Sequence, residues 1–216
     1  MLTNFTTYKR VLVTGAGGVL GTALLSLLGK YDDLEIASPT RNDCDLLDQR
    51  AVESYFEAFQ PDLIFHLAGK VFGVQGNLNF GGQSFYENSK MNLNVVEAAR
   101  KVNTKKLVAA GTTAIYSDIA PLPMKEKDLW LGAPHGSEGP YGHAKRGMLA
   151  QLESYQTQYG LQFCYLILTN LYGPNDRFDE QFGHVVPSLV SRFSKARDEN
   201  LSEVVCWGDG LSLIHI

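Results

Sequence analysis

The most informative segment of the sequence is Thr14-Gly15-Ala16-Gly17-Gly18-Val19-Leu20-Gly21. It follows an apolar run and opens an amphipathic segment, and Gly15, Gly18 and Gly21 have the spacing G-x-x-G-x-x-G. Glycines in this order allow a tight turn and a close approach of the backbone to a pyrophosphate, whose charge lies at the N-terminus of the next helix. A tight turn is the simpler interpretation of each glycine alone. Strand, glycine loop and helix in sequence predict a dinucleotide site.

Outward from this loop, apolar strand-length runs alternate with helix-length amphipathic stretches. The expected strands are Arg10–Thr14, Leu34–Ala37, Leu63–Leu67, Lys106–Ala110 and Gln162–Leu168. The expected helices are Gly18–Gly29, Asp48–Phe59, Gln83–Val102 and Tyr141–Tyr159. Strands that are apolar almost throughout are typical of parallel sheets covered on both faces. The pattern predicts an α/β fold with a doubly wound parallel sheet, the Rossmann arrangement.

The chain is long enough for one complete domain and part of another, because 216 residues exceed the usual domain length of about 100–150. We expect a dinucleotide-binding domain over residues 1–170 and the beginning of a smaller substrate domain over residues 171–210. The second part should contain a helix at Val185–Arg197 and a strand at Glu203–Trp207. Long loops at Gly69–Gly82, Gly111–Gly139 and Thr169–Gly183 follow expected strands, where the ligand site of such a sheet is built.

Composition excludes several classes of protein. Nineteen basic and 23 acidic residues give a net charge of -4, so no basic excess is present to bind nucleic acid. The longest apolar runs are of strand length, which predicts no membrane span, and no signal peptide is recognisable. Three widely spaced cysteines without a CxxC pair fit reduced thiols in the cytoplasm, and we expect no metal site.

The end of the second expected strand bears on the choice of cofactor. It reads Ala37-Ser38-Pro39-Thr40-Arg41 and lacks the carboxylate that binds the ribose 2'-hydroxyl of NAD. Arg41 can instead pair with a 2'-phosphate, although an exposed surface arginine is the alternative interpretation. NADP is therefore favoured and NAD remains possible. Asp45 and Leu46 are expected to flank the adenine.

A proton-transfer motif stands at Tyr141-Gly142-His143-Ala144-Lys145. Tyr141 and Lys145 are four residues apart, so they share one face of a helix. A nearby ammonium favours the phenolate and should lower the pKa of Tyr141, which can then exchange a proton with a substrate carbonyl or hydroxyl. The same spacing on a solvated helix is common by chance. Its combination with the glycine loop and the hydroxyl pair Thr112-Thr113 favours catalysis.

These residues resemble the extended short-chain dehydrogenase/reductase superfamily, which pairs a serine or threonine with Tyr-x-x-x-Lys. Within it, the closest resemblance is to the GDP-L-fucose synthase family, NADPH-dependent epimerase–reductases of a GDP-linked 4-keto-6-deoxy sugar. The specific stretches are Arg41 with Asp45–Asp48, then Thr169–Asp176, His184–Leu189 and Val205–Gly210.

The resemblance assigns a role to individual residues of this chain. It implies catalysis by Thr112, Tyr141, Lys145 and His184, and substrate binding by Asn170, Val185 and Trp207. It implies cofactor binding by Gly15, Gly18, Val19, Leu20, Gly21, Arg41, Asp45, Leu46, Ala68 and Lys145. It also implies a nucleotide-sugar substrate, with GDP favoured as the nucleotide, and a homodimer formed through the two long helices, Gln83–Val102 and Tyr141–Tyr159.

Two positions depart from the family. Gly17 stands where a second arginine would contact the 2'-phosphate, and Ala114 stands where the family has the cysteine used in epimerisation. Because alanine neither donates nor accepts a proton, we expect reduction of the 4-keto group without the full double epimerisation. The alternatives are a nucleotide-sugar 4-epimerase with tightly bound NAD, and a dinucleotide-binding sensor without catalysis.

The resemblance ends at Gly210. The remaining residues, 211–216, match nothing in the family and read like one frame of a sequencing adapter. We expect them to be a non-native tail on a truncated reading frame.

Overall fold

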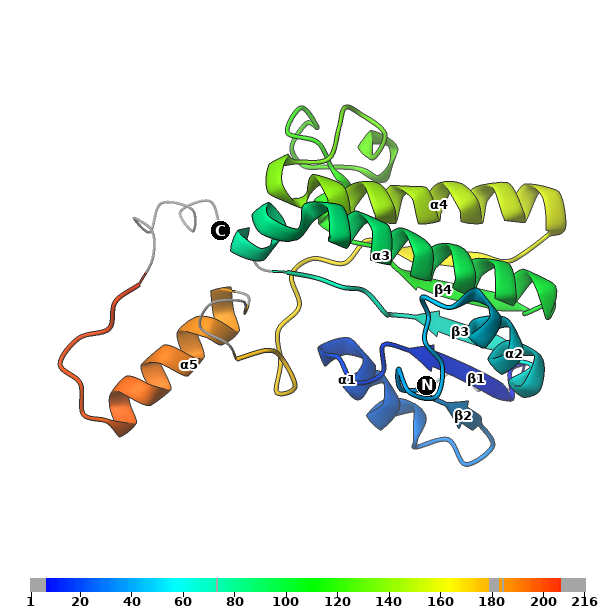
Figure 1. The fold of residues 1–216 in the computed structure, drawn as a ribbon, viewed down its shortest axis with the longest axis horizontal. Helices are drawn as coiled ribbons and strands as arrows, with labels where there is room; N and C mark the ends of the chain where they lie inside the picture. Colours follow the sequence, from blue (N-terminus) through cyan, green and yellow to red (C-terminus); the bar gives the residue numbers. More distant parts are fainter. Residues whose placement is uncertain (1–6, 73, 179–182, 184, 207–216) are drawn as a thin grey trace.

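The computed structural model describes residues 7–72, 74–178, 183 and 185–206 of the chain. Its centre is one parallel sheet with the strand order β2-β1-β3-β4-β5 (Figure 1). The strands are β1 (Arg10–Thr14), β2 (Glu35–Ala37), β3 (Leu63–His66), β4 (Lys106–Ala110) and β5 (Phe163–Leu166). All four neighbouring pairs are parallel. The expected doubly wound α/β sheet is confirmed.

Helices cover both faces of the sheet (Figure 1). The helices that cover it are α1 (Val19–Leu28), α2 (Gln49–Phe59), α3 (Val74–Lys101) and α4 (Gly139–Tyr159), and a further helix, α5 (Val185–Asp198), follows β5. Alternate residues of β1 show the two layers. Val11 and Val13 pack with Leu28 of α1, whereas Leu12 packs with the buried side chains of α2, α3 and α4. A strand that is buried on both faces is apolar throughout, which is the pattern seen in the sequence.

The ends of the helices follow local sequence signals. The Asp48 carboxylate accepts a hydrogen bond from the backbone N–H of Arg50 at 2.9 Å and so caps α2. Gly160 ends α4 with φ +75°, a left-handed conformation that glycine adopts without strain. Apolar residues form a stripe on one face of α4, and two of them, Met148 and Leu152, are buried against the sheet.

Two expected elements differ in the structure. The third helix begins at Val74 and not at Gln83, with a non-helical bend at Phe80 (φ -124°, ψ 26°). Glycines in the first part of this helix have low helix propensity, which made the segment look like a loop. The strand expected at Glu203–Trp207 is wrong over 203–206, because these residues have no strand partner in the described part of the chain; Trp207 lies outside it. A strand requires a hydrogen-bonded neighbour, whatever its apolar content.

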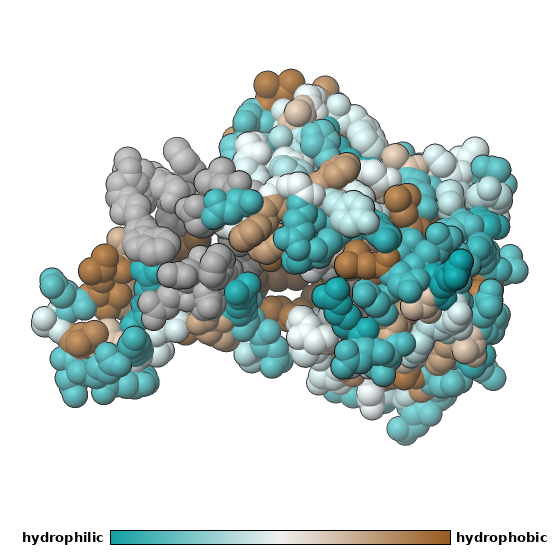
Figure 2. Space-filling view, viewed as in Figure 1, coloured by the Kyte–Doolittle hydropathy of each residue, from teal (hydrophilic) through white to brown (hydrophobic). Residues whose placement is uncertain are grey.

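The division at residue 170 stays a prediction. Residues beyond β5 continue into α5, which stands apart from the helices that cover the sheet (Figure 1). Hydrophobic side chains lie open on the surface there, as Figure 2 shows at the left of the view, and they include Val185, Val190 and Phe193. Within the described residues, no helix combines the length and apolarity needed to cross a membrane.

Candidate functional site

The glycine loop joins β1 to α1 in a conformation that only glycine accepts without strain. Gly15 has φ +72°, and a Cβ at this position would lie 2.6 Å from the backbone nitrogen of Ala68. Gly18 is the N-cap residue of α1, and Gly21 is buried against the carbonyl of Gly15. A Cβ on Gly17 would meet nothing within 4 Å, so one side of the loop is open. This loop presents backbone N–H groups at a helix N-terminus, as an anion site requires.

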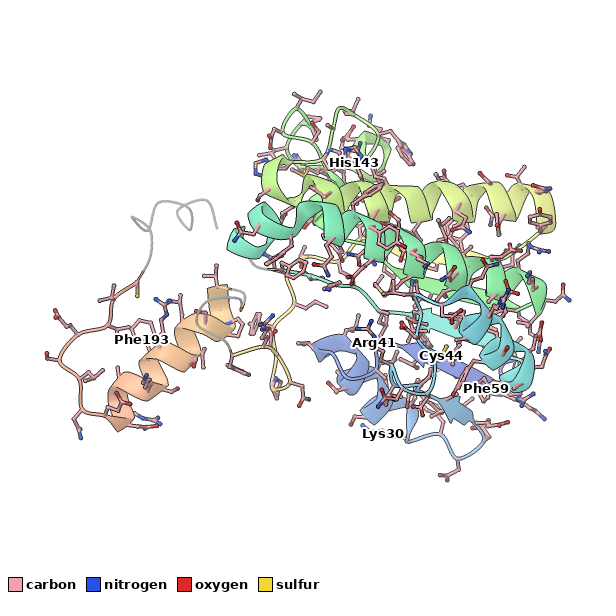
Figure 3. All side chains as sticks on the ribbon, in the orientation of Figure 1. Lys30, Arg41, Cys44, Phe59, His143 and Phe193 are labelled. Atoms are coloured by element: carbon pink, nitrogen blue, oxygen red, sulfur yellow. The ribbon has the colours of Figure 1, made fainter. Side chains whose placement is uncertain are left out.

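A cavity of about 580 Å³ lies beside this loop at the carboxyl ends of β1, β2 and β3. The expected cofactor residues Gly15, Arg41, Asp45, Leu46 and Ala68 all line it. Figure 3 shows Arg41 in the segment after β2, between α1 and α2. In the sheet order the chain proceeds from β1 to β2 on one side and from β3 to β4 on the other, and the crevice lies at this switch point, the usual ligand position in this architecture. Volume, glycine loop and apolar walls fit the adenosine half of a dinucleotide.

The charges around the cavity leave Arg41 available to a ligand. Its side chain is 74% exposed, and its Nη2 lies 3.7 Å from the Asp45 carboxylate. An exposed pair at this distance is a weak interaction. Across the cavity, Lys70 is paired with Glu87 at 2.8 Å. The guanidinium of Arg41 can therefore turn to a 2'-phosphate with little loss of interaction energy with Asp45.

A second cavity, of about 240 Å³, is lined by two of the expected catalytic residues. Thr112, Tyr141 and Asn170 line it together with Val19 and Leu20 of α1. The five residues come from three expected groups, catalytic, substrate-binding and cofactor-binding, and the fold brings them to one place. The two cavities flank the same glycine loop and α1 start, so one extended cofactor can reach from the first into the second.

The Thr112 hydroxyl is already fixed from one side. Its Oγ1 accepts a hydrogen bond from the backbone N–H of Ala114 at 3.1 Å and caps the short 3₁₀ turn η1 (Thr113–Ile115). A hydroxyl that accepts from the backbone keeps its own hydrogen for a further acceptor. Thr112 is therefore suited to donate to a substrate oxygen in the second cavity.

Lys145 is fully buried beneath Tyr141. Its Nζ donates to the carbonyl of Ala110 at 2.9 Å and lies 5.7 Å from the centre of the Tyr141 ring. Burial lowers the pKa of Lys145 to about 8. The expectation that Lys145 lowers the pKa of Tyr141 is wrong in this structure, since burial and then the Glu138 carboxylate raise the pKa of that phenol. Desolvation is the larger of these two causes, and Tyr141 carries its proton at neutral pH.

Sequence reasoning missed a buried chain of polar groups next to the site. The Thr14 hydroxyl donates to Nδ1 of His66 at 2.8 Å, and Nε2 of His66 donates to the side-chain oxygen of Asn92 at 3.0 Å. The direction follows from the Asn92 amide nitrogen, which donates to the carbonyl of Ala144 at 3.3 Å. Burial and the Lys145 charge lower the pKa of His66 to about 3, so the ring is neutral. The one available signal was a histidine inside the apolar run of β3.

Some of the expected residues line neither cavity: Gly18 and Gly21 lie at the start of α1, and Lys145 is buried below Tyr141. Val185 is the first residue of α5, is 60% exposed and lines neither cavity. His184 and Trp207 lie outside the described residues. In the described ranges, no cluster of three or more His, Cys, Asp or Glu side chains could hold a metal.

Comparisons with known proteins agree with this geometry. GDP-L-fucose synthase of Escherichia coli (strain K12) is 35% identical over 202 residues, covering 94% of this chain and 63% of that protein. A GDP-L-fucose synthetase from Naegleria fowleri, solved with NADP bound, has a TM-score of 0.82 and 30% identity, covering 91% of this chain and 61% of the other. A GDP-6-OMe-4-keto-L-xylo-heptose reductase from C. jejuni has a TM-score of 0.82 and 30% identity, covering 91% and 60%.

This chain thus spans less than two thirds of the length of these relatives. A family model described as the NAD dependent epimerase/dehydratase family matches residues 11–214. The resemblance expected from the glycine loop, the Tyr-x-x-x-Lys motif and the neighbouring stretches is confirmed. The chain belongs to the NAD dependent epimerase/dehydratase family.

Proposed function

We propose that the protein is an NADP-dependent reductase of a GDP-linked 4-keto-6-deoxy sugar. The observation that carries this is the second cavity, which Thr112 and Tyr141 both line, with the buried Lys145 next to the Tyr141 ring. A proton donor, a hydrogen-bond donor and a neighbouring dinucleotide cavity are what reduction of a ketone requires. The names of the relatives, GDP-L-fucose synthase and a GDP-heptose reductase, support a GDP-linked substrate.

Each residue has a part in this reaction. Thr112 donates a hydrogen bond to the ketone oxygen and polarises it. Tyr141 gives its proton to that oxygen as charge develops, because its raised pKa keeps the phenol protonated before the reaction. Lys145 supplies positive charge beneath the phenol as the phenolate forms. The nicotinamide, when bound, supplies the hydride.

The assignment of NADP rests on the cavity beside Arg41. That guanidinium is exposed at the rim of the first cavity and makes only a long contact with Asp45. Guanidinium and phosphate form paired hydrogen bonds of matching geometry. The NADP bound in the Naegleria fowleri relative supports the same choice. NADPH is therefore the expected reductant.

Replacing Tyr141 by phenylalanine tests the proposal directly. We expect Tyr141→Phe to lower the rate of NADPH oxidation with GDP-4-keto-6-deoxymannose by about 10³-fold, because general acid catalysis contributes about 10²–10⁴. The dissociation constant of NADPH should stay unchanged, since the ring remains in place. Tyr159→Phe, at the exposed end of the same helix, is the matched control. Equal turnover in Tyr141→Phe and wild type would contradict the proposal.

Epimerisation is a separate question, decided at Ala114. This residue lines the second cavity, and its methyl group cannot move a proton. We expect the reaction in deuterated water to place no deuterium at the two carbons that flank the ketone. Mass spectrometry of the product measures this. Deuterium at both carbons would show that another group performs the epimerisation.

We infer in addition that two copies of the chain associate through α3 and α4. The apolar stripe of α4 gives no support, because it is buried within the chain. Support comes from α3, where Tyr86 and Leu93 are two turns apart and are 59% and 54% exposed. Sedimentation velocity tests this, and a monomer at every concentration would contradict it.

We also place the protein in the cytoplasm. Its cysteines, Cys44, Cys164 and Cys206, are unpaired, which suits a reducing compartment. Fractionation of the cells that produce the protein would test this, and recovery from an oxidising compartment would contradict it.

A further inference from the structure

Arg146 is a buried charged residue that the proposed mechanism does not use. It follows Lys145 on α4, and its side chain is 8% exposed. Burial lowers its pKa, yet a guanidinium keeps its charge. Charged side chains are almost never buried to this degree without a role for their hydrogen bonds.

The hydrogen bonds of Arg146 join two distant parts of the long connection after β4. Its Nε donates to the carbonyl of Ile115 at 2.8 Å, and its Nη1 donates to the carbonyl of Gly132 at 2.6 Å. Ile115 is the last residue of η1, and Gly132 lies on the return of the connection toward α4. The Trp130 ring lies 5.9 Å from the guanidinium. The Arg146 side chain thus binds two parts of this connection, at Ile115 and at Gly132, and attaches both to α4, the helix that carries Tyr141.

The two basic neighbours on α4 hold the backbone on both sides of Thr112. Lys145 binds the carbonyl of Ala110, two residues before Thr112, and Arg146 binds the carbonyl of Ile115, three residues after it. Between these points, the N–H of Ala114 donates to the Thr112 hydroxyl. The position of that hydroxyl therefore depends on where Arg146 holds η1.

The contact between α4 and η1 is also unusually close. A Cβ on Gly142 would collide with the carbonyl of Ala114, so the helix backbone lies directly against the turn. Tyr141 is the residue before Gly142. A small movement of η1 relative to α4 thus changes the spacing between the Thr112 hydroxyl and the Tyr141 phenol.

We propose that Arg146 is a positioning residue that holds η1 against α4 and keeps the Thr112 hydroxyl aligned with Tyr141. The proposal rests on the proposed function for its effect on turnover. The forked guanidinium reaches two carbonyls at once, which a single ammonium cannot do in the same geometry. Its Nη2 is buried and has no hydrogen-bond partner among the described residues, a cost that the two other hydrogen bonds of Arg146 have to offset.

Hydrogen exchange tests the positioning without any substrate. In Arg146→Lys, we expect the amide of Ala114 to exchange at least about tenfold faster, because a lost bond to a charged group amounts to about 1.5–3 kcal/mol. Amides of β1 and β3 should exchange as in the wild type. Arg100→Lys is the matched control, since Arg100 pairs with Glu97 on α3, away from η1. An unchanged rate at Ala114 in Arg146→Lys would overturn the proposal.

Turnover tests the link to Thr112. We expect Arg146→Lys to lower kcat about 100-fold, the cost of displacing an aligned group by about 1 Å, with KM for NADPH unchanged. In a Thr112→Ala background the same substitution should have less than a twofold further effect, because the aligned hydroxyl is already absent. Equal losses of kcat in both backgrounds would show that Arg146 acts only on general stability.

The two measurements separate this proposal from the function on which it rests. Absence of turnover in the wild-type chain with NADPH and the keto sugar contradicts the reductase proposal, and the exchange rate at Ala114 still decides the role of Arg146. Turnover in the wild type with no change in Arg146→Lys leaves the function intact and refutes the positioning.

Discussion

Two phenylalanines show how differently the two regions of the molecule are built. Phe56 on α2 is fully buried in the core between the sheet and α2, α3 and α4. Phe193 on α5 is 53% exposed, and Figure 3 shows it on a helix that stands away from the sheet. The region up to β5 has a large buried apolar core as well as exposed apolar residues, whereas the buried residues of α5 are Pro187 and Ala196 alone.

The two cavities of the site differ in which of these regions line them. All the described residues that line the first cavity belong to the sheet region, so the proposed cofactor contacts lie there. The second cavity also draws on residues 168–171 and Asp176. That segment is held to the sheet region, since the Asn175 amide donates to the Thr22 hydroxyl at 3.1 Å. Cofactor and substrate binding should therefore respond differently to changes in the two regions.

The largest expected effect comes from truncating the two phenylalanines. Phe56→Ala should lower the free energy of unfolding by about 3–5 kcal/mol, because it opens a cavity in a packed core. Phe193→Ala should change it by less than about 0.5 kcal/mol, as for exposed positions generally. Urea denaturation followed by circular dichroism measures both. Similar losses in the two variants would mean that α5 is packed as tightly as α2.

A smaller effect on stability is expected from His66, which is buried in the centre of the sheet region and makes stability depend on pH. The pKa of His66 falls to about 3 on folding, from an ordinary value of about 6.5. Between these two values the His66 ring is protonated in the unfolded chain and neutral in the folded chain. The stability present above pH 6.5 is therefore lost as the pH falls toward 3. We expect a loss of about 2 kcal/mol between pH 6 and 4.5 from this residue.

His66→Gln isolates this contribution, because the amide has no proton to gain in that range. The unfolding free energy of the variant should fall less steeply between pH 6 and 4.5 than that of the wild type. Parallel pH curves for the two proteins would show that His66 does not titrate on unfolding.

The smallest effect concerns the rim of the cofactor cavity. Arg41→Ala should weaken NADPH binding about tenfold, because one charge-assisted contact to phosphate is worth about 1.5 kcal/mol or more. NADH binding should stay the same, since NADH lacks the 2'-phosphate. Arg50→Ala, an exposed arginine on α2, is the control. Quenching of the intrinsic fluorescence by each cofactor measures the dissociation constants, and an equal loss for both cofactors would refute the assignment to the 2'-phosphate.

The fold was predictable because each strand of the sheet is a local apolar run and each turn has a local signal. The site was predictable where one motif places its own residues, as in the glycine loop or the pair Tyr141 and Lys145. Three features were not. The helical start of α3 before Phe80 was hidden by its glycines, which have low helix propensity. The polar chain through His66 and the hydrogen bond from Arg146 to Ile115 join segments far apart in sequence. Neither propensity nor spacing reports such contacts.

The buried Lys145 has a consequence for how the protein can change by mutation. Lowering its pKa from an ordinary 10.5 to about 8 means that folding disfavours the ammonium by about 3 kcal/mol. This loss of stability is complete below pH 8 and disappears as the pH rises toward 10.5, where Lys145 is neutral in the folded and in the unfolded chain. A neutral side chain of similar shape would give a more stable protein and would remove the positive charge beneath the Tyr141 phenol. Selection for thermostability alone would therefore tend to remove the group on which the proposed chemistry depends.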